Sequence, residues 1–228
     1  MNSCTDRFPG VTAIDVGCGS HKRPGYFGID LAAGEAVDRV HDLATTRWPF
    51  DDGQIEKVFS NHCFEHLACP LIFLREMLRV CRDGAEIEIW TPYGRSNEAF
   101  GYGHHIFLTE MHWRHICWEY DRHYLADVPG YFEWVGTNYT IAQNVVQELT
   151  ELGVPIAFAL QHLFNIAPEW GVSLVARKSA ARAPGPQYPI PSYSPPGKRD
   201  RRHPIEPHAD LTRGFPQRMR GLLRRWIS

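Results

Sequence analysis

Residues 13–20 read Ala13-Ile14-Asp15-Val16-Gly17-Cys18-Gly19-Ser20, and this stretch decides the fold of the 228-residue chain. A short apolar run breaks here into glycines, as a buried strand does when its backbone must then bend closely around a ligand. A second apolar run, Phe27-Gly28-Ile29-Asp30-Leu31, places an acid eleven residues after Gly19. Such an acid can accept hydrogen bonds from ribose hydroxyls. The pattern predicts a nucleotide-type cofactor site at the first strand of an α/β sheet.

The short crossover between these two runs disfavours a dinucleotide. A pyrophosphate site needs a third glycine three residues after the second, and Lys22 stands there. Only ten residues separate Gly19 from Asp30, and they include Pro24-Gly25, so little helix can form whose N-terminus would bind a phosphate. S-adenosylmethionine carries ribose, adenine, a carboxylate and a sulfonium but no phosphate. It is therefore the cofactor that the sequence favours.

Further blocks extend the pattern along the chain. They are Pro24-Gly25-Tyr26, Val40-His41-Asp42-Leu43, Trp48-Pro49-Phe50-Asp51-Asp52-Gly53, His62-Cys63-Phe64-Glu65-His66-Leu67 and the run from Phe73 to Cys81. With Asp15 to Gly19 and Ile29-Asp30, these blocks resemble the class I S-adenosylmethionine-dependent methyltransferases, and within them the small bacterial type-11-like group. The resemblance spans residues 11–178 and implies a methyltransferase (EC 2.1.1.-). The chain departs from the common pattern in its missing third glycine and in its shortened first helix.

The hydrophobic periods predict an α/β fold with a Rossmann-like doubly wound sheet of about seven strands, mostly parallel, and a reduced first crossover helix. Beyond the first two, strands are expected over Val37–Leu43, Ile55–Ser60, Ala85–Thr91, Phe132–Tyr139 and Gly171–Arg177. Helices are expected over Leu71–Arg82, Thr140–Leu152 and Ile156–Ile166. Ligands in such sheets bind beyond the carboxyl ends of the strands.

Aspartates at three successive strand ends are the expected cofactor contacts. Asp15 would orient the glycine turn or meet the methionine amino group, and Asp30 would accept the ribose hydroxyls. Asp42 would accept from the exocyclic amine of adenine while Leu43 packs on the ring. Each aspartate taken alone is equally consistent with a turn or cap residue. The full predicted cofactor set is Asp15, Gly17, Cys18, Gly19, Asp30, Leu31, Asp42, Leu43, Asn61 and His62.

The segment His62-Cys63-Phe64-Glu65-His66 spells H-x-x-E-H, a zinc-peptidase signature in which both histidines share a helix face. Here the segment directly follows an expected strand, so we expect a loop instead, with Asn61 and His62 lining the cofactor cleft. Glu65 would begin the next helix, and His66 would be structural. Another set, His112, His115 and Cys117, lacks a fixed tetrahedral pattern. No metal site is predicted.

The segment from Tyr93 to Tyr124, part of a loop or lid at about 93–130, is expected to bind the methyl acceptor. It contains hinge glycines, aromatic residues and five histidines, which suit a segment that closes over a substrate. A hydroxyl acceptor must lose its proton, and a neutral histidine is the natural base near pH 7. By resemblance to a Thr-His-x-x-Phe-Phe-Thr block, His105 is the first candidate and His104 the second. The alternative for either is a hydrogen-bonding scaffold.

Charge and proline are concentrated at one end of the chain. Residues 179–228 hold ten Lys or Arg against three acids, and nine of the seventeen prolines. We expect a cofactor-binding domain over 1–178 and a Pro-rich basic tail over 179–228, with an extended linker from Ala181 to Pro207. A short amphipathic segment at 215–227 would contact an anionic membrane, an acidic partner or the domain itself. The acidic domain disfavours nucleic acid as the acceptor.

The leading hypothesis is S-adenosylmethionine-dependent methyl transfer, as O-methylation of a small molecule or of a glycan- or lipid-linked sugar in a biosynthetic reaction. The alternative is a catalytically silent S-adenosylmethionine-binding module that scaffolds or regulates a partner through its basic tail. An NAD-dependent oxidoreductase is a distant third hypothesis. Because the sequence shows no signal peptide, no long apolar run and no disulfide spacing, we expect a cytoplasmic protein with reduced thiols.

Overall fold

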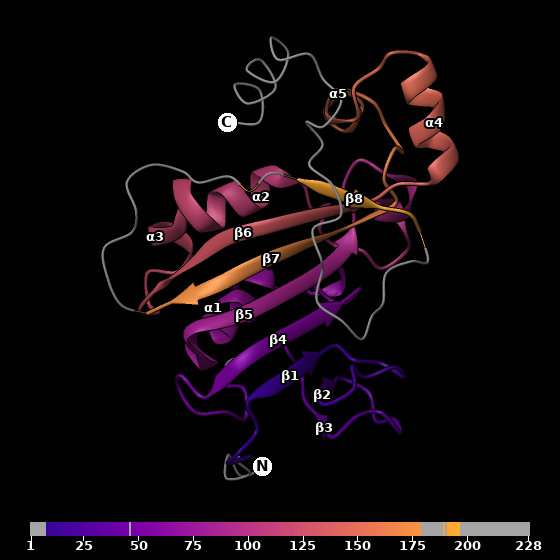
Figure 1. Ribbon diagram of the computed structural model, residues 1–228. Helices are drawn as coiled ribbons and strands as arrows, with labels where there is room; N and C mark the ends of the chain where they lie inside the picture. The colour runs from indigo at the N-terminus through magenta and orange to yellow at the C-terminus, as the bar shows by residue number, and fades with distance from the viewer. Residues whose placement is uncertain (1–7, 46, 179–188, 190, 197–228) are drawn as a thin grey trace.

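The computed structural model describes residues 8–45, 47–178, 189 and 191–196. They form one eight-stranded sheet in the order β3-β2-β1-β4-β5-β7-β6-β8 (Figure 1). The strands are β1 (Ala13–Val16), β2 (Phe27–Asp30), β3 (Arg39–Val40), β4 (Ile55–Asn61), β5 (Cys81–Pro92), β6 (Tyr131–Thr140), β7 (Glu169–Arg177) and β8 (Ser192–Ser194). β1 to β5 are parallel, and β7 is antiparallel to both β5 and β6. The predicted mostly parallel Rossmann-like sheet is confirmed, with one strand more than expected.

The longest helix of the described residues, α1 (Pro70–Val80), connects β4 to β5. Pro70 begins the helix, where a missing N–H costs nothing, and Phe73, Met77 and Leu78 bury one face in the core. The remaining helices are α2 (Glu110–Arg114), α3 (Asp121–Tyr124), α4 (Gln143–Glu151) and α5 (Ile156–His162), with a π-helical turn at His115–Glu119 and 3₁₀ turns η1 (Phe64–His66) and η2 (Asn97–Phe100). Figure 1 shows α4 and α5 beyond one end of the sheet.

The crossover from β1 to β2 contains turns and no helix, so the predicted reduction of the first helix is confirmed. The two strands pair directly, with Ile14 opposite Phe27, and the N–H of Gly17 donates to the carbonyl of Ile29 at 2.8 Å. On one face of β4 and β5, Lys57 and Glu86 expose 52% and 71% of their side chains. Further along the same face Phe59 and Trp90 are buried, so the face is open to solvent at Lys57 and Glu86 and covered beyond them.

Several element boundaries differ from those predicted. The expected strand Val37–Leu43 is reduced to Arg39–Val40, because the chain turns again at Asp42, whose carbonyl accepts the Thr45 N–H at 3.1 Å. α1 ends two residues early because β5 already begins at Cys81, and α4 begins at Gln143 because β6 continues to Thr140. α5 ends at His162 rather than at Ile166.

One part of the predicted linker lies in the sheet. Residues 192–194 form β8, which pairs in parallel with β6, and the Ser194 hydroxyl donates to the Asn138 side chain at 2.9 Å. The expected extended linker over 181–207 is therefore wrong for these residues. The domain boundary after residue 178 stays a prediction, and the amphipathic segment at 215–227 lies outside the described residues. None of the described helices has the length and apolar character needed to cross a membrane.

Candidate cofactor and acceptor site

The glycine turn after β1 packs against the segment that follows β4. Gly17 and Gly19 have φ angles of +74° and +53°, which side chains rarely adopt. A Cβ on Gly17 would lie 2.3 Å from both the Cβ and the Sγ of Cys63, whereas a Cβ on Gly19 would meet nothing within 4 Å. Glycine is thus required at position 17 for two reasons, the backbone conformation and the close packing against Cys63.

Asp15 lies near the end of β1, just before the glycine turn. Its side chain is buried and accepts the Arg23 N–H at 2.7 Å, so it is bonded to the crossover beyond the glycine turn, and its predicted role toward that turn or the methionine amino group stays a prediction. Burial raises the pKa of Asp15 to about 6, against the lowering effect of the Arg23 N–H. Cys18 is also buried, and desolvation raises the pKa of its thiol to about 12. Cys18 is therefore a protonated packing residue near neutral pH.

Asp30 links the glycine turn to β2. One carboxylate oxygen accepts the Gly19 N–H at 2.8 Å and the other accepts the Ala32 N–H at 3.1 Å. A carboxylate has about four acceptor positions, so both oxygens can still accept from a ribose. Leu31, next to it, is 70% exposed. The geometry is compatible with the cofactor roles predicted for both residues, which stay predictions.

The loop after β3 carries Asp42 and Leu43. The Asp42 side chain is exposed and accepts the Ala44 N–H at 2.9 Å. Leu43 is only 5% exposed, and its carbonyl accepts the indole N–H of Trp48 at 3.3 Å. Leu43 is thus part of the hydrophobic core, and its packing on an adenine ring stays a prediction.

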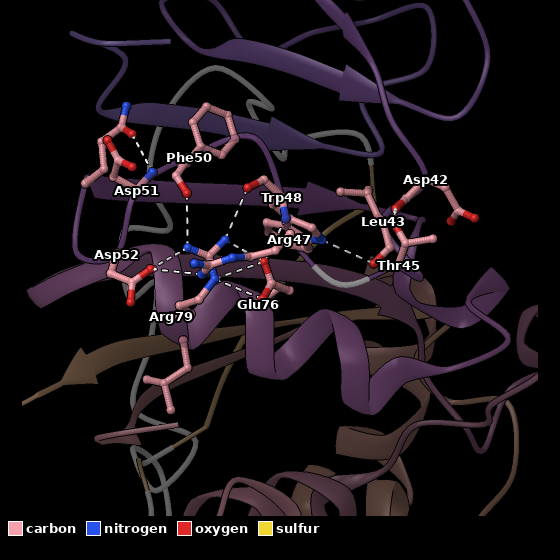
Figure 2. A network of polar contacts seen from close by, with 12 residues as sticks. Asp42, Leu43, Thr45, Arg47, Trp48, Phe50, Asp51, Asp52, Glu76 and Arg79 are labelled. Carbon is pink, nitrogen blue, oxygen red and sulfur yellow. Dashed lines mark hydrogen bonds and ion pairs between the residues drawn. The ribbon is translucent and has the colours of Figure 1, made fainter. Parts of the chain in front are cut away.

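A partly buried ion-pair network, absent from the predicted site, anchors residues 48–52, which follow this loop (Figure 2). Arg79 on α1 donates to Glu76 at 2.6 Å, to Asp52 at 2.7 Å and to the carbonyl of Phe50 at 3.0 Å. Glu76 in turn accepts the Trp48 N–H at 2.7 Å. Figure 2 shows these side chains gathered below Phe50 and Trp48, with Asp42 apart on the other side of the view. The only sequence signal was the run of charged residues on the polar side of α1.

His62, after β4, lies between two carboxylates. Its ring contacts Glu65 at 3.2 Å and Glu169 at 2.8 Å. Burial alone would lower the pKa of His62, but the hydrogen bonds with Glu169 and Glu65 outweigh it and raise the pKa to about 9. His62 is therefore charged near neutral pH. Its predicted neighbour in the site, Asn61, ends β4 opposite Trp90.

The structure separates the two histidines of the H-x-x-E-H segment. His62 has a φ of +51° and lies before η1, whereas His66 belongs to that short turn, so they share no helix face. The ring of His66 packs at 4.7 Å from the ring of His104. The arrangement is not that of a zinc peptidase.

The predicted bases His104 and His105 lie beside η1. The N–H of His105 donates to the carbonyl of Glu65 at 2.7 Å, and its side chain is exposed. The Nδ1 of His104 contacts the carbonyl of Ala99 at 3.0 Å. These contacts tie His105 to η1, which follows β4, and His104 to η2.

Two cavities flank α2. The first, of about 220 Å³, is mainly apolar and lies between η1, α1 and α2, where Phe64, Leu74 and Trp113 line it. The second, of about 190 Å³, lies between α2, α5 and β6. Glu110 lines the second cavity and accepts the hydroxyl of Tyr139 at 2.5 Å. Either cavity offers space for part of an acceptor.

Comparisons with known proteins match the first part of the sheet to a family model. Residues 14–89, from β1 into β5, match the family model described as a methyltransferase domain. This region of the chain is similar to the methyltransferase domain of that family. The resemblance drawn from the sequence is confirmed, and the cofactor of the domain is S-adenosylmethionine. The site fits this group, because the open space beside Gly19 leaves room for close backbone approach and no helix N-terminus follows β1 to receive a pyrophosphate.

Solved structures that are similar to the chain have low sequence identity to it. An S-adenosylmethionine-dependent methyltransferase from Mesorhizobium loti is 12% identical, with 73% of this chain and 91% of that chain covered and a TM-score of 0.44. YcgJ from Bacillus subtilis is 10% identical, with 75% and 93% covered and a TM-score of 0.47. A phosphoethanolamine N-methyltransferase from Haemonchus contortus, solved with phosphoethanolamine and S-adenosylhomocysteine, is 11% identical, with 77% and 41% covered and a TM-score of 0.45. No curated protein matches the chain.

Proposed function

We propose that the domain methylates a hydroxyl group, on a small molecule or on a glycan- or lipid-linked sugar, and that His105 accepts the hydroxyl proton. When bound, S-adenosylmethionine supplies a methyl group on a sulfonium, and S-adenosylhomocysteine is the leaving group. The protein must align the acceptor oxygen in line with the carbon–sulfur bond and exclude water. It must also take the proton that the hydroxyl loses as the carbon–oxygen bond forms.

The residues after β1 and β2 would hold the cofactor in this proposal. Asp30 would accept the ribose hydroxyls with the acceptor positions that Gly19 and Ala32 leave open. Burial disfavours the charged form of Asp15, and a cationic amino group of the cofactor nearby would stabilise that form. Asp42 would accept from the adenine amine at the exposed edge of the site.

One contact carries the assignment of the base. The His105 N–H is bonded to the Glu65 carbonyl, and Glu65 lies two residues after Cys63, which packs against Gly17. This chain of contacts ties the histidine segment to the cofactor turn. The exposed His105 side chain has the freedom to meet an acceptor, whereas His104 is engaged with Ala99 and His66. His105 is therefore the first candidate and His104 the second.

The test is turnover to S-adenosylhomocysteine with a panel of hydroxyl acceptors, followed by the His105→Gln variant. Loss of a general base lowers kcat by about 10²–10⁴. We expect that loss with unchanged affinity for S-adenosylmethionine, and a bell- or sigmoid-shaped pH profile of kcat that the variant flattens. His123→Gln is the matched control, because it alters another histidine of the same segment.

Three outcomes would count against the proposal. If carboxylates or amines turn over and hydroxyls do not, the acceptor class is wrong. If His105→Gln keeps the wild-type kcat, His105 is only a contact residue. If the protein binds S-adenosylmethionine and turns over no acceptor, the silent binding module is favoured.

A further inference from the structure

Three side chains with metal-binding atoms converge beside the methyltransferase site. Glu65 and His66 belong to η1, and His104 lies 38 residues further along the chain. One ligand atom from each lies within 4.8 Å of the ligand atoms of the other two. Two imidazoles and one carboxylate are a donor set that suits zinc and neighbouring divalent transition metals.

Backbone carbonyls orient both imidazole rings. The Nδ1 of His66 lies 3.1 Å from the carbonyl of Gly103, and the Nδ1 of His104 lies 3.0 Å from the carbonyl of Ala99. A carbonyl only accepts, so in the neutral rings Nδ1 carries the proton and Nε2 keeps its lone pair. Metal-binding histidines almost always have their second nitrogen held in this way.

The carboxylate provides the second independent observation. The Glu65 side chain is 2% exposed, and its Oε2 is buried without any hydrogen-bond partner in the described part of the chain. Its other oxygen contacts His62, which is held in turn by Glu169. A buried oxygen without a donor is costly, and a bound cation would satisfy it. The contact with His62 fixes the orientation of the carboxylate, as is common for ligating carboxylates.

We propose that Glu65, His66 and His104 bind one divalent metal ion of the zinc class. Three protein ligands leave at least one coordination position open, and His66 is exposed, so solvent can reach the ion. The ion would connect η1 to the segment after η2 and so fix the His104-His105 segment against the end of β4. The proposed site differs from the H-x-x-E-H zinc site, because His62 contacts Glu65 and Glu169 instead of binding the metal.

The proposal does not depend on the methyl acceptor or on His105 as a base. Binding is measured on the full-length chain without an affinity tag, after chelator treatment and dialysis, by calorimetric titration with Zn²⁺. We expect one ion per chain with a Kd below about 1 μM, which corresponds to about −8 kcal/mol. Neither S-adenosylmethionine nor an acceptor is present, so failure of metal binding and failure of methyl transfer are separate results.

Variants locate the ion. We expect His66→Gln and His104→Gln each to weaken Zn²⁺ binding by about 100-fold or more, whereas His105→Gln keeps the wild-type affinity. Co²⁺ in place of Zn²⁺ should give visible absorption bands in the wild type and in His105→Gln, and lose them in the two ligand variants. Zn²⁺ should also raise the Tm of the wild type, as any ligand of the native state does.

The proposal is overturned if the wild type binds no Zn²⁺, or if both ligand variants bind as tightly as the wild type. The second result would place the ion at other histidines or cysteines of the chain. If a histidine variant fails to fold by circular dichroism, Glu65→Gln replaces it as a test, because it keeps the side-chain size and removes the charge. Wild-type Zn²⁺ affinity in a folded Glu65→Gln variant would equally overturn the proposal.

Discussion

The cofactor edge (residues 15–43) and the acceptor edge (residues 61–66 and 93–124) are built by different kinds of contact. At the cofactor edge, carboxylates bind backbone N–H groups nearby in sequence, as Asp15 does with Arg23 and Asp30 with Gly19. At the acceptor edge, contacts join distant segments, and the His62–Glu169 pair spans 107 residues. Local contacts therefore shape the first edge, whereas the assembled sheet shapes the second.

The difference has a consequence for what each edge can tolerate. A local turn is determined by a few backbone angles, so a single residue at a special angle can disrupt it. Side chains from distant segments are held in place by the core beneath them, and several bonds together fix their positions. Substitutions at the two edges should therefore differ in the size of their effects and in the property affected, cofactor affinity or stability.

Gly17→Ala should give the largest effect and test the local character of the cofactor edge. The new Cβ would lie 2.3 Å from Cys63 atoms at a φ of +74°, so the turn must move. We expect S-adenosylmethionine affinity, measured calorimetrically, to fall by about 100-fold, or about 3 kcal/mol. Gly19→Ala is the matched control, because Gly19 has a similar φ but open space around it. This variant should weaken the free energy of S-adenosylmethionine binding by only about 1–2 kcal/mol, the strain of the left-handed conformation.

The double variant Gly17→Ala/Cys63→Gly separates packing from backbone strain. Removal of the Cys63 side chain clears both close contacts, so part of the affinity should return. If the double variant binds no better than Gly17→Ala, the clash with Cys63 is not the cause of the loss.

Arg79→Met should give the next largest effect, because Arg79 is an exception at the cofactor edge. Its bonds reach from α1 to Asp52 and to the carbonyl of Phe50, which lie 27 and 29 residues earlier in the chain and follow the loop of Asp42. The change leaves Glu76, 9% exposed at its side chain, without its charge partner. Breaking a fully buried pair costs about 3–5 kcal/mol, and because the Asp52 partner is 72% exposed we expect a smaller loss of about 2 kcal/mol, which urea unfolding at pH 7 would measure.

Arg47→Ala is the control for Arg79→Met. The Arg47 side chain is 63% exposed and lies 3.4 Å from the same Asp52, and such surface pairs contribute about 0–1 kcal/mol. Equal losses of stability in the two variants would show that the partly buried network does not anchor residues 48–52.

The sequence predicted the parallel sheet and the short first crossover, because the apolar runs and the Pro24-Gly25 break that mark them lie within a few residues of one another. The cofactor contacts of Asp15, Asp30 and Asp42 stay predictions. The network of Arg79 was not predicted, because a charged residue on an amphipathic helix is usually solvated. Likewise, no spacing rule places His104 against His66, since only the folded sheet brings η1 and η2 together.

His62→Gln tests the acceptor edge through pH. Because the pKa of His62 is raised to about 9 in the folded protein, its contribution to stability is fully present below its unfolded pKa near 6.5. The contribution is lost as the pH rises through 9. The side chain is 35% exposed, so solvent screening limits the effect to about 1 kcal/mol.

The measurement compares the free energies of unfolding of wild type and His62→Gln at pH 6 and pH 10. The deficit of the variant should be largest at pH 6 and shrink at pH 10, and Glu169→Gln should show the same trend. A deficit independent of pH would mean that packing, and not the charge of His62, holds the two carboxylates.

Asp42→Asn should give the smallest effect, because the Asp42 side chain is exposed and already accepts the Ala44 N–H. Asparagine can keep that bond through its oxygen, but its NH₂ replaces the oxygen that would face the adenine amine. We expect about a fivefold loss of S-adenosylmethionine affinity, or about 1 kcal/mol, the usual size of one exposed hydrogen bond. The inosine analogue of the cofactor, which has a carbonyl in place of the amine, should lose less or gain. If both ligands weaken equally, Asp42 stabilises only its own turn, and recognition of the adenine belongs to backbone groups of the same edge.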